Sequence, residues 1–296
     1  MIRFQQFEEL YPFQARSLNL GALRYNYLDE GQGEVLLMLH GNPTWSFYYR
    51  NLVLGLRDKY RCVVPDHIGC GFSEKPFKYN YTLSQHIENL ETLVDSLQLK
   101  NITLVLHDWG GAIGMGFAVR NPEKIARIVV FNTAAFLSDH IPASINFCRL
   151  PVLGSIAILL CNAFMRGAFA RACVHRERLT EKVREGYLAP YNTYANRIGI
   201  LRFIQDIPIH PGIPSYPVVK SIQENLHQFN DRPMLIIWGK QDFCFNDHFL
   251  QRWKEYFPEA EVHELQDAGH YVVEDAHERI VPWMQDFIQE HPLLKK

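Results

Sequence analysis

The residues ITLVLHDWGGAIGMGFAVR, at positions 102–120, decide the fold of this chain. They open with the run ITLVL, which is typical of a buried strand because it is short, apolar and rich in β-branched residues. After two consecutive glycines the chain continues as an apolar segment that is long enough for a helix. A strand, a sharp turn and a helix in this order can expose a nucleophile at the turn, and here Asp108 stands at that position.

Similar apolar runs recur along the chain, separated by segments with helical periodicity. Residues 83–97 carry apolar side chains at helical spacing, and residues 282–288 indicate a closing helix. Strands that alternate with helices predict an α/β fold with a mostly parallel, doubly wound sheet. Besides residues 102–106, the predicted strands lie at residues 35–39, 62–64, 128–131, 234–238 and 261–265.

A long segment without strand signals interrupts this alternation after Asn132. It contains helical patches and several prolines, and the strand pattern resumes near Pro233. We therefore predict a helical cap inserted over the sheet. The predicted core comprises residues 1–133 and 229–296, and the predicted cap comprises residues 134–228.

The composition of the chain excludes several classes of protein. At 296 residues, with 47% hydrophobic and 21% charged residues, the chain is typical of a globular protein with a sizeable core. Its 30 basic and 32 acidic residues are scattered, so no basic stripe predicts a nucleic-acid partner. Six cysteines occur without a CxxC pair, so we expect no zinc site, no disulfide framework and no cofactor.

Two segments bear on the cellular location. Residues 1–12 lack the apolar run of a secretory signal, so we expect a cytoplasmic protein. The most apolar stretch, residues 150–165, is interrupted by a proline, a glycine and an asparagine. It falls short of the ~20 apolar residues that span a bilayer, so we expect a cap element there and no transmembrane segment.

Three further motifs complete a candidate active site. Asp242 follows the strand predicted at residues 234–238, and His270 follows the one at 261–265. Along the chain the nucleophile comes first, then the acid, then the histidine. This is the order found in proteins that carry the nucleophile on such a turn. The loop HGNP at residues 40–43 closes an early strand, where a backbone N–H group can help to form an oxyanion hole.

Each of these residues also has a structural explanation when it is taken alone. An aspartate before a helix is commonly an N-cap, and Asp242 could cap the turn that follows its strand. Asn42 is a frequent turn former, and Trp109 could fill the core. Four motifs in the right order and context favour catalysis over these separate explanations.

An aspartate nucleophile restricts the chemistry. A carboxylate with a reference pKa of ~3.9 is ionised at neutral pH and needs no base before it attacks. Its attack on an ester carbonyl would give a reactive anhydride, whereas displacement at a saturated carbon gives a stable alkyl ester. We therefore predict a leaving group on an sp3 carbon, such as a halide, an epoxide oxygen or a strained lactone oxygen. His270, oriented by Asp242, could then activate water to release the ester.

Several longer motifs carry a resemblance to a known family. HGNPTWSFYYR at residues 40–50, PDHIGCGFSEKP at 65–76 and HDWGG at 107–111 resemble the haloalkane dehalogenase group of the α/β-hydrolases. FNTAAF at residues 131–136, the segment at 187–209, WGKQDFCFNDHFL at 238–250 and GHYVVEDAHE at 269–278 resemble, within that group, the bacterial β-lactone decarboxylases of long-chain olefin biosynthesis. The resemblance covers nearly the whole chain and implies the α/β-hydrolase fold.

The resemblance also implies roles for individual residues. The side chains of Asn42 and Trp109 would hold the departing halide or the developing carboxylate of an opened lactone. For a cis-β-lactone, Asp108 would attack the ring carbon that bears oxygen, and loss of CO2 would then expel Asp108 and leave an alkene. Asn132 stands where some dehalogenases carry their catalytic acid, which leaves Asp242 as the better candidate.

Three alternatives to the lactone decarboxylase stay open. The first is a haloalkane dehalogenase that releases halide by hydrolysis. The second is an epoxide hydrolase, which needs cap tyrosines that protonate the epoxide oxygen, with Tyr187, Tyr191 and Tyr194 as candidates. The third is a non-catalytic ligand receptor, because fold does not fix function.

The cap and the implied pathway give two further expectations. Apolar walls for alkyl tails could come from Leu150, Val152, Leu153, Ile156, Ile158, Leu159 and Leu160. Plain helix packing explains these residues equally well. The resemblance also implies association with the β-lactone synthetase of the same pathway.

Overall fold

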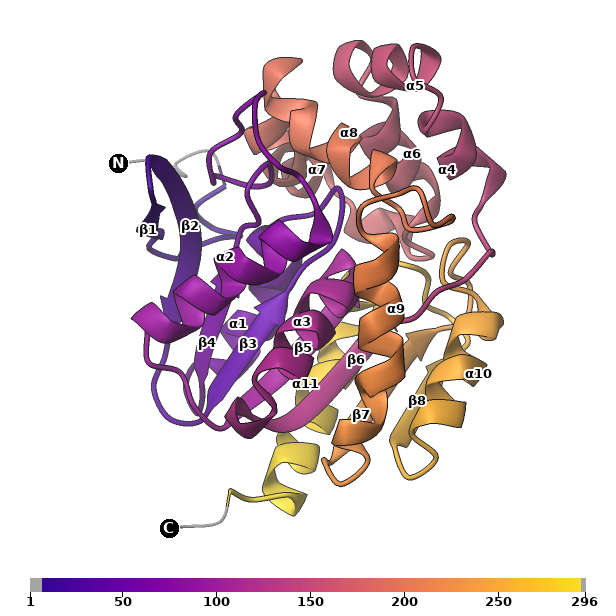
Figure 1. The fold of residues 1–296 in the computed structure, drawn as a ribbon. Coiled ribbons are helices and arrows are strands. Elements are labelled where there is room, and N and C mark those ends of the chain that lie inside the picture. Colours follow the sequence, from indigo (N-terminus) through magenta and orange to yellow (C-terminus); the bar gives the residue numbers. More distant parts are fainter. Residues whose placement is uncertain (1–6, 294–296) are drawn as a thin grey trace.

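One eight-stranded sheet forms the centre of the computed structural model, which describes residues 7–293 (Figure 1). The strand order is β1-β2-β4-β3-β5-β6-β7-β8. β1 and β2 are antiparallel to their neighbours, and the strands from β4 to β8 are parallel to one another. The strands are β1 (Arg16–Leu20), β2 (Leu23–Glu30), β3 (Val35–Leu39), β4 (Arg61–Pro65), β5 (Ile102–Asp108), β6 (Ile125–Thr133), β7 (Met234–Gly239) and β8 (Glu261–Leu265).

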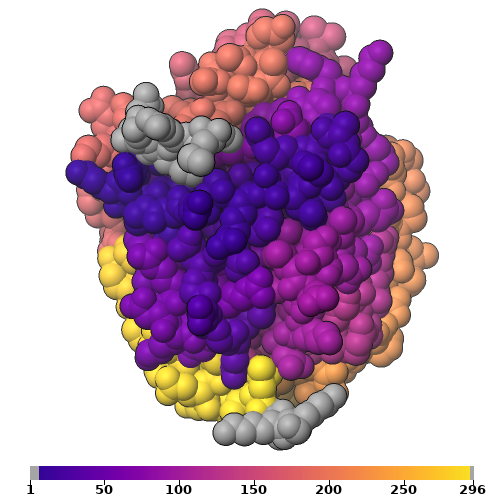
Figure 2. All heavy atoms as spheres, turned by 90° about the vertical axis from the view of Figure 1, so that its left-hand side faces the viewer, coloured from indigo at the N-terminus to yellow at the C-terminus, as the bar shows by residue number. Residues whose placement is uncertain are grey.

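The six predicted strands are all present. Five of them are apolar runs, as expected of parallel strands covered on both faces, whereas β8 lies at the edge of the sheet and is mostly exposed or half-buried. β3 and β5 are buried along their whole length. The sequence reasoning missed β1 and β2, which form the antiparallel edge of the sheet and mix polar with apolar residues. Figure 2 shows this N-terminal part of the chain, in indigo, across one side of the molecule.

Helices cover both faces of the sheet (Figure 1). α3 (Trp109–Arg120) contacts α2 (Leu83–Ser96) and α9 (Tyr216–Asn225), whereas α1 (Arg50–Leu56) contacts α11 (Val272–Glu290). α11 begins well before the predicted closing helix at residues 282–288 and includes Pro282. Its side chains Met284, Phe287 and Ile288 are buried, as the helical spacing predicted.

The segment between β6 and β7 is helical, and no strand occurs in it among the described residues. This arrangement confirms the predicted α/β fold with a mostly parallel, doubly wound sheet. The principal helices of the segment are α4 (Ala143–Cys148), α5 (Leu153–Ser155), a π-helix (Ile156–Leu160), α6 (Ala163–Arg171), α7 (Glu181–Leu188), α8 (Ile198–Gln205) and α9. The division at residues 134–228 stays a prediction, and α9, inside that range, packs on α3 of the core.

Within residues 7–293, no single helix is long and apolar enough to cross a membrane. Two consecutive segments, Leu153–Leu160 and Ala163–Arg171, reach that length and composition only together, and they are bent by 77° at the break between them.

Candidate active site

Asp108 lies at the turn between β5 and α3, with backbone angles φ 50° and ψ −126°. This conformation is strained for a residue other than glycine, and such strain is typical of functional sites. The backbone N–H of Asn42 donates to Oδ1 of Asp108 at 2.6 Å, and the N–H of Trp109 also bonds this carboxylate. The hydroxyl of Thr133 donates to the backbone carbonyl of Asp108. The turn therefore presents the carboxylate and fixes one of its oxygens.

Two glycines allow the close approach of chains at this turn. A Cβ atom on Gly41 would overlap the Asp108 carboxylate, and a Cβ atom on Gly110 would overlap the carbonyl oxygen of Leu39. Glycine at these two positions therefore lets the loop after β3 reach the nucleophile from one side and lets α3 start directly against β3.

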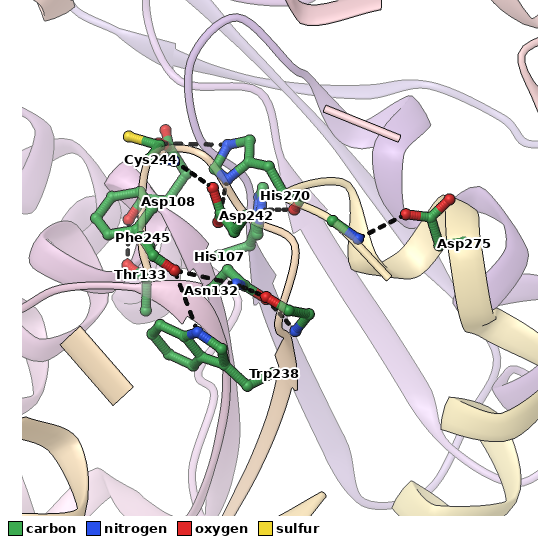
Figure 3. Close-up of polar contacts among 12 residues, drawn as sticks. His107, Asp108, Asn132, Thr133, Trp238, Asp242, Cys244, Phe245, His270 and Asp275 are labelled. Carbon is green, nitrogen blue, oxygen red and sulfur yellow. Dashed lines mark hydrogen bonds and ion pairs between the residues drawn. The ribbon is translucent and has the colours of Figure 1, made fainter. Parts of the chain in front are cut away.

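His270 lies between Asp242 and Asp108 (Figure 3). Its Nδ1 is 2.8 Å from Oδ2 of Asp242, and its Nε2 is 3.8 Å from Oδ2 of Asp108. Since a carboxylate only accepts hydrogen bonds, Nδ1 carries the proton and Nε2 faces Asp108. The structure thus brings together the three residues that sequence order singled out.

Burial and charge act in opposite directions on these groups. Burial raises the pKa of Asp108, although His270 and the N–H of Asn42 act to lower it. Burial acts to lower the pKa of His270, but the carboxylates of Asp242 and Asp108 outweigh it and raise this pKa. The site therefore favours an imidazolium between two carboxylates more strongly than water does.

The Asp242 loop and the His270 loop are held by residues that sequence reasoning did not assign to the site. Asp242 Oδ1 accepts the N–H of Cys244 at 2.6 Å. Asn132, at the end of β6, bonds both the N–H and the carbonyl of Gly239. Buried Asp275 accepts the N–H of Gly269 at 2.8 Å, and Nε2 of His107 is 2.9 Å from the carbonyl oxygen of His270. The only signal of these roles in the sequence is a polar residue at an otherwise apolar strand end or helix start.

Asn42 and Trp109 differ in how their side chains are engaged. The Asn42 amide donates to the carbonyl oxygen of Ile200 at 3.2 Å, and its Oδ1 has no hydrogen-bond partner among the described residues. The Trp109 ring packs on Phe203, with ring centroids 5.2 Å apart, and its indole N–H has no partner within residues 7–293. Trp109 therefore has its indole N–H available at the site, and the Asn42 amide, which carries two N–H donors, uses one of them on Ile200.

The family model of the alpha/beta hydrolase fold matches residues 34–155 and 159–276. The chain belongs to this family. A cis-3-alkyl-4-alkyloxetan-2-one decarboxylase of Shewanella oneidensis is 48% identical over 289 residues, which cover 96% of this chain and 91% of that protein. A second decarboxylase of this kind, from Xanthomonas campestris, is 42% identical over 297 residues, which cover 96% of this chain and 98% of that protein.

More distant relatives are named as haloalkane dehalogenases. Haloalkane dehalogenase 2 of Mycobacterium tuberculosis is 33% identical over 285 residues, which cover 94% of this chain and 96% of that protein. Among solved structures, haloalkane dehalogenase DatA of Agrobacterium tumefaciens matches with a TM-score of 0.84 and 25% identity, over 94% of this chain and 97% of that chain. These similarities confirm the predicted resemblance to the dehalogenase group and to its β-lactone decarboxylases.

Cavities of this α/β-hydrolase lie between the cap and the carboxyl ends of the strands. Two of them reach Asp108, and their walls are mainly apolar. The prediction that apolar side chains within residues 150–160 form walls for alkyl tails is wrong, because none of those residues lines either cavity. Most of them face outward, and Val152 is 67% exposed. Hydrophobicity placed these side chains in the cap but could not tell which surface of the cap they occupy.

The three candidate cap tyrosines do not line either cavity. The Tyr187 hydroxyl donates to Oε1 of Glu274 at 2.5 Å, and the Tyr191 hydroxyl donates to the carbonyl oxygen of Thr44 at 3.2 Å. Tyr194 is 58% exposed. None of the three is placed to protonate an epoxide next to Asp108, which disfavours the epoxide hydrolase. In the described part of the chain, no group of three or more His, Cys, Asp or Glu residues is arranged to hold a metal ion.

Proposed function

We propose that this enzyme converts cis-3-alkyl-4-alkyloxetan-2-ones, which are cis-dialkyl β-lactones, into alkenes and CO2. The observation that carries the proposal is the nucleophile: Asp108 presents a carboxylate to mainly apolar cavities, with one oxygen fixed by backbone N–H groups. A carboxylate in such a site suits displacement at a saturated carbon of a hydrophobic substrate. The two decarboxylases at 48% and 42% identity support the lactone as that substrate.

The first step forms an ester between Asp108 and the substrate. Oδ2 of Asp108, which faces His270, attacks the ring carbon that bears oxygen and breaks its bond to that oxygen. The ring oxygen leaves as part of a carboxylate on the neighbouring carbon. The indole N–H of Trp109 is a donor that can stabilise this developing negative charge, while the backbone N–H of Asn42 keeps Oδ1 in place.

The second step releases the alkene without water. The bond between the neighbouring carbon and its carboxylate breaks, and its electron pair forms the double bond to the attacked carbon. The bond from the attacked carbon to Oδ2 breaks at the same time and returns its pair to Asp108. No proton is gained or lost. An imidazolium at His270 lowers the energy of the returning carboxylate, and Asp242 favours this charged form. His270 then acts as an electrostatic stabiliser in the lactone reaction.

The haloalkane dehalogenase is the second candidate, favoured by the dehalogenase relatives and solved structures. It begins with the same attack by Asp108 but ends with water adding to the ester carbonyl, for which His270 must be neutral. The indole N–H of Trp109 and the second amide N–H of Asn42 are the side-chain donors that this pair offers a halide.

The test offers the purified enzyme a cis-dialkyl β-lactone and, separately, a 1-bromoalkane, and measures alkene and bromide. We expect alkene from the lactone, loss of that activity in Asp108→Asn, and no loss in the control Asp267→Asn, an exposed carboxylate near His270. Single turnovers in H2¹⁸O separate the two release steps. Decarboxylation leaves the Asp108 peptide unlabelled, whereas hydrolysis places ¹⁸O in it. Bromide release without alkene would reject the proposal.

We also propose that the enzyme works in the cytoplasm beside the β-lactone synthetase of the same pathway. The chemical reason is that a strained lactone is hydrolysed in water unless it is passed on quickly. Gel filtration of the two proteins, separately and mixed, tests the association, and unchanged elution volumes at micromolar concentrations would count against it.

A further inference from the structure

The two cavities next to Asp108 meet at the nucleophile and then separate. Both are lined by Asn42, Asp108, Ile145, Phe164 and Cys244. Beyond these shared residues their walls come from different elements. Asp108 therefore stands at the junction of a fork.

The first branch, which we name the α9 arm, runs toward α8 and α9. Its own lining residues include Trp109, Phe136, Ile204, Ile207, Val219 and Phe249. The second branch, which we name the α6 arm, runs along α4 and α6. Its own lining residues include Phe147, Cys148, Gly167, Ala168, Phe243 and His270. The spaces that admit a water-sized sphere measure about 130 Å³ in the α9 arm and about 240 Å³ in the α6 arm.

The divider between the arms comes from the cap. Ile145 on α4 and Phe164 on α6 line both arms, so their side chains stand where the two spaces separate. Both side chains are apolar, and no charged group on the divider opposes an alkyl chain on either side. A substrate with one chain can fill one arm, but only a substrate with two chains can fill both.

We propose that each arm receives one of the two alkyl tails of the lactone, with the ring held at the fork. The inference rests on the proposed function and goes beyond it, because it assigns two separate tail sites. The two tails of the lactone are attached to adjacent ring carbons. When Asp108 contacts the carbon that it attacks, both tails start within one bond of the fork, and each has a mainly apolar path away from it, although Arg171 also lines the α6 arm. This arrangement matches a two-tailed substrate better than a primary haloalkane.

The two arms can be narrowed separately. A Cβ atom on Gly167, in the α6 arm, would meet no atom within 4 Å, so Gly167→Leu can enter that arm without a clash at the backbone. Leucine also has the higher helix propensity, so folding should not suffer. Val219→Phe narrows the α9 arm from α9. The matched controls are Ala170→Leu on α6 and Ser221→Phe on α9, both at exposed positions that line neither arm.

The experiment compares two cis-lactones that carry one methyl and one long tail, with the long tail at position 3 in one and at position 4 in the other. We expect Gly167→Leu to lower kcat/KM for alkene formation at least tenfold with one lactone and little with the other. Val219→Phe should show the opposite preference. Both variants should lose activity on a lactone with two long tails, since each methylene kept out of an apolar site costs about fourfold in binding. The controls should behave as wild type.

The outcomes separate this inference from the proposed function. Suppose the wild-type enzyme forms alkene, but both variants prefer the same lactone or neither changes its preference in kcat/KM. That result would overturn the two tail sites alone. Absence of alkene from every lactone would overturn the proposed function and the tail sites together. Thermal melts of each variant verify folding, and Gly167→Val, with a smaller side chain, must show the same preference as Gly167→Leu in weaker form.

Discussion

The side chain of Asn132 makes two hydrogen bonds to the backbone of Gly239, accepting from its N–H at 2.8 Å and donating to its carbonyl oxygen at 2.9 Å. Asn132 is the penultimate residue of β6, and Gly239 ends the neighbouring β7, from which the chain turns to Asp242. The amide therefore fixes the start of the loop that carries the partner of His270. It bonds the backbone at the carboxyl end of β7 and does not contact the His270 ring.

We expect Asn132→Ala to lower kcat for alkene formation by about a hundredfold, because a shift of about 1 Å in a catalytic group has an effect of this size. KM for the lactone should change little, since Asn132 lines neither arm of the cavity. Steady-state kinetics with a long-chain lactone provide the measurement. If Asn132→Ala and Asn132→Asp lose thermal stability to the same extent and keep the wild-type kcat per folded molecule, Asn132 has a structural role only.

The pH dependence follows from the two raised pKa values. Burial raises the pKa of Asp108, so protonation removes the nucleophile at a higher pH than for a free aspartate. The carboxylates of Asp242 and Asp108 raise the pKa of His270, so the imidazolium persists to a higher pH than for a free histidine. Alkene formation should therefore rise with pH on the acid side and fall again as His270 deprotonates.

A profile of kcat/KM against pH provides this measurement, and its two apparent pKa values belong to the coupled pair. The rate of hydrolysis of an alkyl ester on Asp108 should instead rise with pH on the alkaline side, because hydrolysis needs neutral His270. Alkene formation that keeps rising through the pKa of His270 would contradict the electrostatic role of the imidazolium.

Most of the sheet could be predicted from the sequence because the parallel strands inside it are buried on both faces and appear as uninterrupted apolar runs. The edge strand β1 lacked this signal, since most of its side chains are exposed or half-buried. Asp108, Asp242 and His270 could be found because each follows a predicted strand, and parallel strands end at the same edge of a sheet. The roles of Asn132 and Asp275 could not, because a polar residue within a motif does not show which backbone group it bonds. The fork was also beyond prediction, because it depends on how α4 and α6 pack over Asp108.

Removal of His270 should separate the two kinds of ester release. With His270→Ala we expect a 1-bromoalkane to leave a stable alkyl ester on Asp108, because no base remains to activate water. With the lactone, alkene should still form, slowed by about ten- to a hundredfold, since decarboxylation needs no proton transfer. Intact-protein mass spectrometry detects the adduct, and gas chromatography detects the alkene. Alkene formation as low as in Asp108→Asn would show that His270 takes an obligatory part in the lactone reaction.

A buried ion pair within the core is bonded to the cap by a tyrosine hydroxyl, away from the nucleophile. Arg50 on α1 donates to Glu274 on α11 at 2.5 and 2.9 Å, and the hydroxyl of Tyr187 on α7 donates to the same carboxylate. Arg50 and Glu274 are only 3% and 2% exposed, so neither charge is compensated by water. Glu274→Gln leaves the Arg50 guanidinium buried without its counter-charge, and we expect it to lower the free energy of unfolding by about 3–5 kcal/mol.

The matched control is Glu278→Gln, the same substitution one turn later on α11. Glu278 pairs with Arg178 at 2.7 Å, but the two side chains are 56% and 33% exposed, so the loss should stay below about 1 kcal/mol. Urea unfolding of both variants, followed by far-ultraviolet circular dichroism, gives the comparison. Because the Glu274 carboxylate also receives the hydroxyl of Tyr187, Glu274→Gln should in addition expose the cap to proteolysis before the core unfolds. Similar unfolding energies and cleavage rates for the two variants would show that the buried pair does not hold the cap.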